Sequence, residues 1–283
     1  MTVTDFTDEP EVQQSISMIS DDYESEGREA MKSIISAQGL SKRYTLGKDN
    51  FVDALRGADL DIAAGDMVAI MGPSGCGKST LMHVVGCLDS PDAGEVWLDG
   101  KRVDNLRSRG TTALLRDSIG FIFQGFNLIP TLSSLDNVAM AAQYAGHSRR
   151  DAQQLAREAL AMVGLADRAG HRPTELSGGQ QQRVAIARAL VNKPMVIMGD
   201  EPTGNLDSTS SAEIIAMMRQ INLETGTTFL LVTHDPDVAA ACDRVVHMKD
   251  GSVAREDRLE EAFRSSGEAW EPEPAEDLSP IAA

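Results

Sequence analysis

One stretch of the chain combines residues that bind phosphate with residues that bind a metal ion. Residues 72–80 read GPSGCGKST and fit the pattern GxxxxGK[ST], between an apolar run and a helical pattern. Glycines let backbone N–H groups converge on phosphate oxygens, and the helix N-terminus adds positive potential. Lys78 is expected to reach the β- and γ-phosphates, and the Ser79 hydroxyl to bind Mg²⁺. The predicted ATP-binding residues are Gly72, Pro73, Ser74, Gly75, Cys76, Gly77, Lys78, Ser79 and Thr80.

Two carboxylates end a second apolar run, residues 195–201, which reads MVIMGDE. Ligands of open α/β sheets gather at the carboxyl ends of the strands, where these acids should lie. We expect Asp200 to hold Mg²⁺ and Glu201 to polarise an attacking water as a general base. The alternative is a pair of solvated acids at a strand end. Gly199, which places no side chain in this strand, is expected to weaken its packing.

Residues 176–180 read LSGGQ and admit two interpretations. Ser177 and Gln180 form the pattern of a capping box, which begins a helix without any ligand. Gly178 and Gly179 favour a functional role, because glycine costs roughly 1 kcal/mol per residue in a helix and is suited to close approach by an anion. The chain already has one phosphate loop. This helix start is therefore expected to contact the nucleotide of a second copy.

Alternating strands and helices must position these groups. Strands are expected at 34–37, 54–62, 67–71, 95–98, 119–123, 196–198, 228–232, 244–248 and 252–254. Helices are expected from Ser79, at 148–162, 178–191 and 211–223. This order indicates an α/β fold with a parallel core. The segment 125–180 is expected to form a helical subdomain.

Charge and composition divide the chain into three parts. Residues 1–30 carry a net charge of −8 and residues 256–283 carry −7, which leaves −2 of the total −17 for residues 31–255. We expect a disordered acidic leader at 1–30, one folded domain at 31–255 and a disordered acidic tail at 256–283. Met31 is an alternative start. The acidic ends and the nearly neutral domain argue against a nucleic-acid partner.

Sequence features of secretion and membrane insertion are missing from the chain. The N-terminus has no apolar signal region, and no window approaches the roughly 20 apolar residues of a membrane span. Three scattered cysteines do not form a disulfide framework. We expect a cytoplasmic chain, whose membrane partner, if any, is another polypeptide.

The three motifs together resemble the ATP-binding cassette (ABC) ATPases. Four further residues match that family's pattern in order and spacing from about 33 to 255. The resemblance implies that Tyr44 stacks on adenine, that Gln124 touches Mg²⁺ or water and reports to a transmembrane partner, and that Asp207 lies at the dimer seam. His234 would contact the γ-phosphate. It also implies a parallel P-loop NTPase core of RecA type with an antiparallel β subdomain and an inserted helical subdomain.

The family resemblance implies a mechanism. Two copies would sandwich two ATP molecules, each site using Glu201, His234 and Gln124 for catalysis and Ser79, Gln124 and Asp200 for the metal. Residues Ser177, Gly178, Gly179 and Gln180 would act in trans. This homodimer would drive a separately encoded permease from the inner face of the cell membrane.

Two segments, 85–91 (VGCLDSP) and 120–128 (GFIFQGFNL), are similar to the macrolide-exporter and lipoprotein-release subgroup (MacB/LolD-like). That similarity implies export, extraction or transmission of mechanical force. A non-transport role resembling the division ATPase FtsE, which signals to cell-wall machinery, is the alternative.

Overall fold

A six-stranded, mostly parallel sheet forms the centre of the computed structural model, which describes residues 33–45, 47 and 50–259. Its order is β10-β9-β3-β8-β7-β6, and only β10 runs antiparallel to its neighbour. Strands covered on both faces are mostly apolar, as in β8, where all five residues are buried and only Thr228 is polar. The strands are β3 (Met67–Met71), β6 (Ile119–Phe123), β7 (Val196–Asp200), β8 (Thr228–Val232), β9 (Arg244–Lys249) and β10 (Ser252–Arg258).

A second, antiparallel sheet has the order β2-β1-β4-β5. Its two long strands extend well past the expected ranges 34–37 and 54–62, because bulges interrupt the alternation of buried and exposed residues along β1. The strands are β1 (Ser33–Thr45), β2 (Phe51–Ala63), β4 (Ala93–Leu98) and β5 (Lys101–Arg102).

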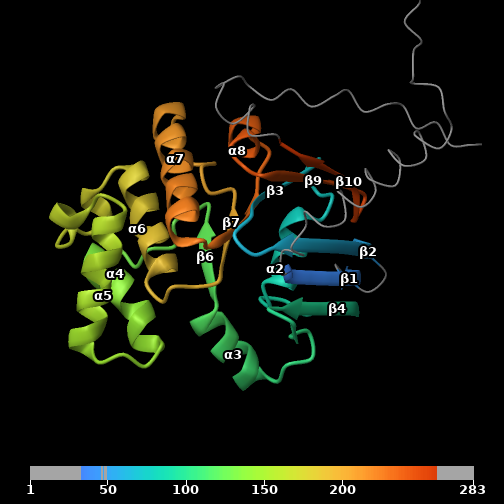
Figure 1. Cartoon of the computed structure of the whole chain (residues 1–283), viewed down its shortest axis with the longest axis horizontal. Helices are drawn as coiled ribbons and strands as arrows, with labels where there is room; N and C mark the ends of the chain where they lie inside the picture. Colours follow the sequence, from blue (N-terminus) through green and yellow to red (C-terminus); the bar gives the residue numbers. More distant parts are fainter. Residues whose placement is uncertain (1–32, 46, 48–49, 260–283) are drawn as a thin grey trace, which may run out of the picture. The chain divides into compact units, whose positions relative to one another are not determined.

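Helix α2 (Lys78–Val85) lies between the two sheets and buries Leu81, Met82, Val84 and Val85 in one hydrophobic cluster. The opposite face of the parallel sheet packs in a second cluster with α6, α7 and α8. In Figure 1 the antiparallel strands and α4–α6 lie on opposite sides of the central sheet. The covering helices are α6 (Gly178–Leu190), α7 (Ser208–Thr225) and α8 (Pro236–Ala240).

The segment between β6 and α6 is helical, as expected. It contains α4 (Ser134–Tyr144), α5 (Arg149–Met162) and the 3₁₀ turns Ala166–Arg168 and Pro173–Glu175. Both α-helices begin at a serine that accepts a hydrogen bond from a backbone N–H in the first turn. Helix α3 (Ser108–Asp117) was not expected from the sequence; none of its residues is fully buried, and Leu114 and Leu115 pack against the cluster around α2.

The C-terminal boundary differs from the expected one. Residues 256–258, expected in the tail, form the end of β10, where Glu256 pairs with Val246 and its carboxylate lies 3.3 Å from the Arg244 guanidinium. Two of the nine acids that suggested a tail, Glu256 and Asp257, therefore belong to an edge strand. The expected leader 1–30, Met31 and the tail from residue 260 lie outside the described residues.

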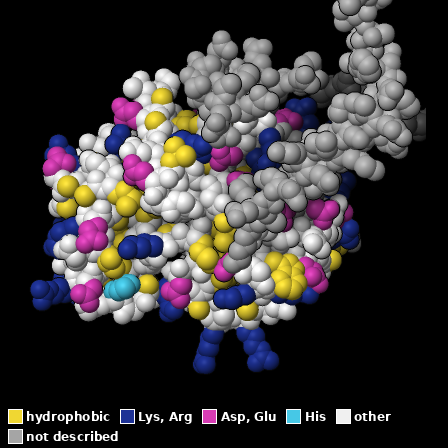
Figure 2. Space-filling view, in the orientation of Figure 1, with side chains coloured by type: hydrophobic (Ala, Val, Ile, Leu, Met, Phe, Trp, Pro, Cys, Tyr) yellow, Lys and Arg dark blue, Asp and Glu magenta, His cyan; other side chains and the backbone are white. Residues whose placement is uncertain are grey.

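The described surface carries mixed charge. Figure 2 shows Lys and Arg side chains interspersed with Asp and Glu on the visible face, without a broad basic area. Within residues 33–45, 47 and 50–259, no helix is long and apolar enough to cross a membrane.

Candidate nucleotide-binding site

The loop between β3 and α2 is pressed against two neighbouring strands. Gly72 has a φ of +149°, and a Cβ there would lie 2.3 Å from the Met248 carbonyl oxygen. Gly77 has a φ of +104°, and a Cβ there would lie 2.2 Å from the Ala54 carbonyl oxygen. These glycines are required by backbone conformation and by space. Cys76, 7% exposed, packs against the first of them.

Lys78 folds back over this loop. Its ammonium donates hydrogen bonds to the carbonyl oxygens of Gly72 at 2.8 Å and Pro73 at 3.0 Å. These bonds hold the Lys78 ammonium against the phosphate-binding loop. This is the arrangement that a phosphate-binding lysine requires.

Two of the three residues expected to bind the metal ion, Ser79 and Asp200, meet across 121 positions of sequence, whereas the third, Gln124, bonds to Asn205. The Ser79 hydroxyl donates to Asp200 Oδ1 at 3.0 Å. A hydroxyl and a carboxylate are hard oxygen donors, and Mg²⁺ is commonly held by one or two such groups with phosphate and water completing its shell. The pair therefore fits Mg²⁺. No group of three or more His, Cys, Asp or Glu suited to a metal occurs in the described part of the chain.

His83, to which no role was assigned from the sequence, lies beside this pair. Its Nε2 is 4.0 Å from Asp200 Oδ2. Helical spacing could have indicated this position in advance, because His83 follows Ser79 by four residues and therefore lies on the same face of α2.

Glu201 and His234 are brought together from the ends of two adjacent parallel strands. Glu201 has a left-handed φ of +48°, held by a 2.9 Å bond from its N–H to the Val232 carbonyl. Such backbone strain in a non-glycine residue concentrates at functional sites. His234 Nδ1 lies 2.9 Å from Glu201 Oε1, and this hydrogen bond, with the carboxylate charge, raises the pKa of His234 above 6.5.

One cavity is lined by part of this set, whereas Asp200, His234 and the loop residues Gly72, Pro73 and Cys76 do not line it. It has a volume of about 380 Å³ and is lined by Tyr44 at the end of β1, by loop and α2 residues, and by Glu201. The full lining is Tyr44, Val52, Ala54, Ser74, Gly75, Gly77, Lys78, Ser79, Thr80, Glu201 and Val232. Among described residues, none of 177–180 contributes to this lining.

Gln124 and the segment before α7 are linked by side-chain bonds. Asn205 Nδ2 donates to the Gln124 carbonyl at 2.9 Å, and Gln124 Nε2 donates to Asn205 Oδ1 at 3.4 Å. Asp207 is the N-cap of α7, accepting from the Ser210 N–H at 2.9 Å, a bond that lowers the pKa of Asp207. The contact between Asn205 and Gln124 could not be predicted from the residue types and is seen only in the fold.

The capping box at the start of α6 is present. The Gln180 N–H donates to Ser177 Oγ at 3.3 Å, and the Ser177 N–H donates to Gln180 Oε1 at 3.0 Å. Packing explains one of the two glycines between them. A Cβ at Gly179 would lie 3.3 Å from the Ser210 side chain, which is tight, whereas one at Gly178 would make an ordinary contact of 3.4 Å with Leu206 Cδ2. Packing therefore leaves Gly178 unexplained.

Gly199 does not leave a packing defect, contrary to expectation. The residue is buried, and a Cβ there would lie 2.8 Å from Leu231 Cδ2 and 3.5 Å from the Pro202 ring. A leucine from the neighbouring strand occupies the space that a side chain would take.

The comparison with known proteins agrees with this geometry. Residues 55–204 match the ABC transporter family. The chain belongs to that family. This ABC ATPase is 47% identical over 220 residues to the uncharacterized ABC transporter ATP-binding protein YknY of Bacillus subtilis, covering 78% of the chain and 95% of YknY.

Other relatives differ in length. The chain is 48% identical over 239 residues to the macrolide export ATP-binding/permease protein MacB of Rhodopseudomonas palustris, covering 84% of this ABC ATPase but only 36% of MacB. A solved structure of the ATP-binding cassette MJ0796, described as dimeric, in a post-hydrolysis state and bound to ADP and Pi, superposes with a TM-score of 0.74 at 43% identity. It covers 80% of this chain and 99% of MJ0796, which comes from Methanocaldococcus jannaschii. These likenesses confirm the expected fold and family, in the expected subgroup.

Proposed function

We propose that this chain is the ATP-hydrolysing subunit of an ABC transporter, which dimerises on ATP and drives a separate membrane permease. One observation carries the proposal. The phosphate loop, the Ser79–Asp200 pair and the Glu201–His234 pair are assembled in one chain, whereas the capped start of α6 lies outside the cavity that Lys78, Ser79 and Glu201 line. A second copy gives that helix start a nucleotide to contact.

Within each site the residues have separate tasks. Lys78 binds the β- and γ-phosphates, Ser79 and Asp200 hold Mg²⁺, and Tyr44 stacks on adenine. For Gln124 to touch Mg²⁺ or its water, the side chain must leave its bond to Asn205. When bound, Mg²⁺ neutralises phosphate charge. Glu201 orients the attacking water and accepts its proton, while His234 contacts the γ-phosphate, as its bond to Glu201 allows.

The dimer is supported by the cassette MJ0796, whose solved structures include dimeric forms. In the proposed homodimer, residues 177–180 of one copy face the γ-phosphate held by the other. The N–H groups at the start of α6 and its dipole favour that anion. Asp207, at the start of α7 beside these glycines, would then lie along the seam.

A separate permease is supported by the lengths of the relatives. MacB is named as both ATP-binding protein and permease, and the chain matches about a third of it. YknY and MJ0796 are matched over 95% and 97% of their lengths, so these relatives are cassettes without an attached permease. The proposed localisation of the chain is the cytoplasmic face of the cell membrane.

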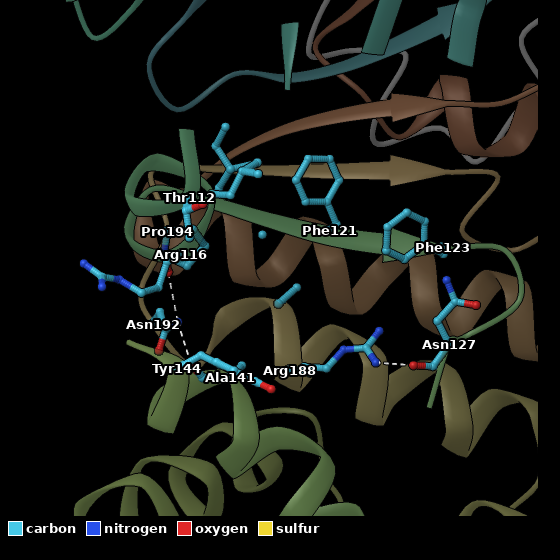
Figure 3. A pocket seen from close by; sticks show the side chains of 14 residues that line it. Thr112, Arg116, Phe121, Phe123, Asn127, Ala141, Tyr144, Arg188, Asn192 and Pro194 are labelled. Atoms are coloured by element: carbon cyan, nitrogen blue, oxygen red, sulfur yellow. Dashed lines mark hydrogen bonds between the residues drawn. The ribbon is translucent and has the colours of Figure 1, made fainter. Parts of the chain in front are cut away.

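An apolar groove supplies a surface for that permease. It has a volume of about 620 Å³ and lies between α3, β6, α4 and α6. Figure 3 shows Phe121 and Phe123, whose rings stack at 5.9 Å, along one wall, with Tyr144 and Arg188 opposite. Tyr144 is 74% exposed. The Arg188 guanidinium donates to the Phe126 and Asn127 carbonyls of the turn that follows Gln124, so the groove borders the loop expected to report to the membrane partner.

We propose that the transporter exports or extracts a substrate or transmits mechanical force; of these tasks, export is supported by the relatives named macrolide export proteins.

The Glu201→Gln variant tests the proposal. It should bind ATP, hydrolyse it more than about 100-fold slower than the native protein, and accumulate as a dimer in size-exclusion chromatography with ATP. Lys78→Ala in the same background should remain monomeric. A monomer at saturating ATP in the Glu201→Gln protein would overturn the proposed dimer.

A further inference from the structure

The segment that follows α2 holds the end of β1 in place. The Arg43 N–H donates to Asp92 Oδ2 at 2.6 Å, and the Asp92 N–H donates to the Ser41 carbonyl at 2.8 Å. The Lys42 ammonium donates to the Ser90 carbonyl at 2.7 Å. Backbone and side chains therefore fix the strand end that carries Tyr44.

Asp89 is the residue of this segment that reaches the Tyr44 side chain itself. Its Oδ2 accepts the Tyr44 hydroxyl proton at 2.8 Å, and its Oδ1 accepts from Lys42 Nζ at 2.7 Å. The same Lys42 nitrogen lies 5.3 Å from the centre of the Tyr44 ring. One carboxylate thus anchors both the tip of the tyrosine and the cation that lies over its face.

The protonation states agree with this arrangement. Partial burial opposes ionisation of Asp89, but the bonds from Lys42 and Tyr44 outweigh it and lower the pKa of Asp89. Burial, followed by the bond to Asp89, raises the pKa of Tyr44. At neutral pH an anionic acceptor therefore faces a protonated phenol.

Residues near both ends of α2 are connected to the cavity, one set directly and the other through Tyr44. Its first residues, from Lys78 to Thr80, line the phosphate end, and Asp89 follows its last residue by four positions. Asp89 itself does not line the cavity, whereas Tyr44 does. Its influence on a bound nucleotide must pass through the tyrosine.

We propose that Asp89 is a positioning residue for the adenine-binding surface, which fixes the Tyr44 ring before the nucleotide arrives. The inference rests on the proposed role of Tyr44 as the stacking partner of the base. Without the carboxylate the ring samples other rotamers, and ATP binding must then order it.

Steady-state kinetics of Asp89→Ala test this inference. The KM for ATP should rise about three- to tenfold while kcat stays within about twofold, because the phosphate end is untouched. Inhibition by inorganic tripolyphosphate, which has no base, should keep its native inhibition constant. Tyr44→Phe, which removes only the hydroxyl, should raise the KM by the same factor and serves if Asp89→Ala does not fold. Asp53→Ala is the matched control, because Asp53 pairs with the exposed Arg43 at the same strand end and does not line the cavity.

Tyr44→Ala distinguishes the stacking role of Tyr44 from the positioning role of Asp89. If Tyr44→Ala raises the KM and Asp89→Ala adds nothing in that background, both the stacking role and the positioning role hold. If Tyr44→Ala raises the KM but neither Asp89→Ala nor Tyr44→Phe does, the positioning role is wrong and the stacking role stands. If Tyr44→Ala leaves the KM unchanged, the stacking role itself is wrong. Weaker binding of tripolyphosphate in Asp89→Ala would show a general structural effect and overturn the inference.

Discussion

Two substitutions of Ser177 separate its role as a helix cap from its proposed role at a second copy's nucleotide. The side chain is exposed and caps α6 through the Gln180 N–H at 3.3 Å. Ser177→Ala removes that bond, and loss of an N-cap costs about 1 kcal/mol, or about 2–4 °C in Tm for a domain of this size. Ser177→Asp retains an N-cap acceptor and suits the helix dipole, so its Tm should equal or slightly exceed the native value.

The aspartate should nevertheless abolish function, because its carboxylate would face the γ-phosphate in the dimer. Two like charges about 4 Å apart repel by about 4 kcal/mol at an effective dielectric of 20, which corresponds to roughly a 1000-fold loss. ATPase rate, thermal unfolding and ATP-dependent dimerisation in the Glu201→Gln background should all be measured. Binding of ATP to the monomer should persist, since Ser177 does not line the cavity. A Ser177→Asp protein that dimerises and hydrolyses ATP at the native rate would refute the role in trans and leave Ser177 a cap alone.

Three further predictions concern the rest of the molecule. By NMR titration the His234 pKa should lie above 6.5 and should fall in Glu201→Gln, and an unchanged pKa would contradict the pairing. The small contribution of this pair to the free energy of unfolding is fully present below pH 6.5 and is lost as the pH rises through the raised pKa. Gly199→Ala should lower the free energy of unfolding by about 1–3 kcal/mol in denaturant titration, because its Cβ would lie 2.8 Å from a methyl carbon of Leu231. The folded variant should retain its activity, and an unchanged denaturation midpoint would contradict the close packing. Tyr144→Arg should leave the basal ATPase intact and abolish copurification with the permease, whereas Leu223→Arg, at a similarly exposed residue of α7, should affect neither.

Local patterns were sufficient for the phosphate loop and the capped helices. The GxxxxGK[ST] spacing, the box at 177–180 and the buried run at 228–232 each depend on neighbours within a few residues. These parts of the fold follow from turn, cap and strand chemistry in one stretch of sequence.

Contacts between distant residues could not be predicted in the same way. Tyr44 and Asp89 are separated by 45 positions, and Gln124 and Asn205 by 81. Nothing in the residue type of Asp89 distinguishes it from other acids, so its partner appears only when β1 is placed beside the segment after α2. Helix α3 was missed for a different reason, because it is short and its apolar side is made of only a few residues, among them Leu114 and Leu115.

Helix α6 joins two surfaces that the proposal assigns to different partners. It begins at Ser177 and carries Arg188 in its last turn, where the guanidinium grips the turn after Gln124. At about 1.5 Å per residue, its 13 residues span about 20 Å. In the proposed dimer, a shift of the N-terminus of α6 caused by the neighbouring copy's nucleotide would therefore also move Arg188 and the groove. Conversely, a permease segment that moves Arg188 would act on the site of the opposite subunit, because residues 177–180 would contact that subunit's nucleotide.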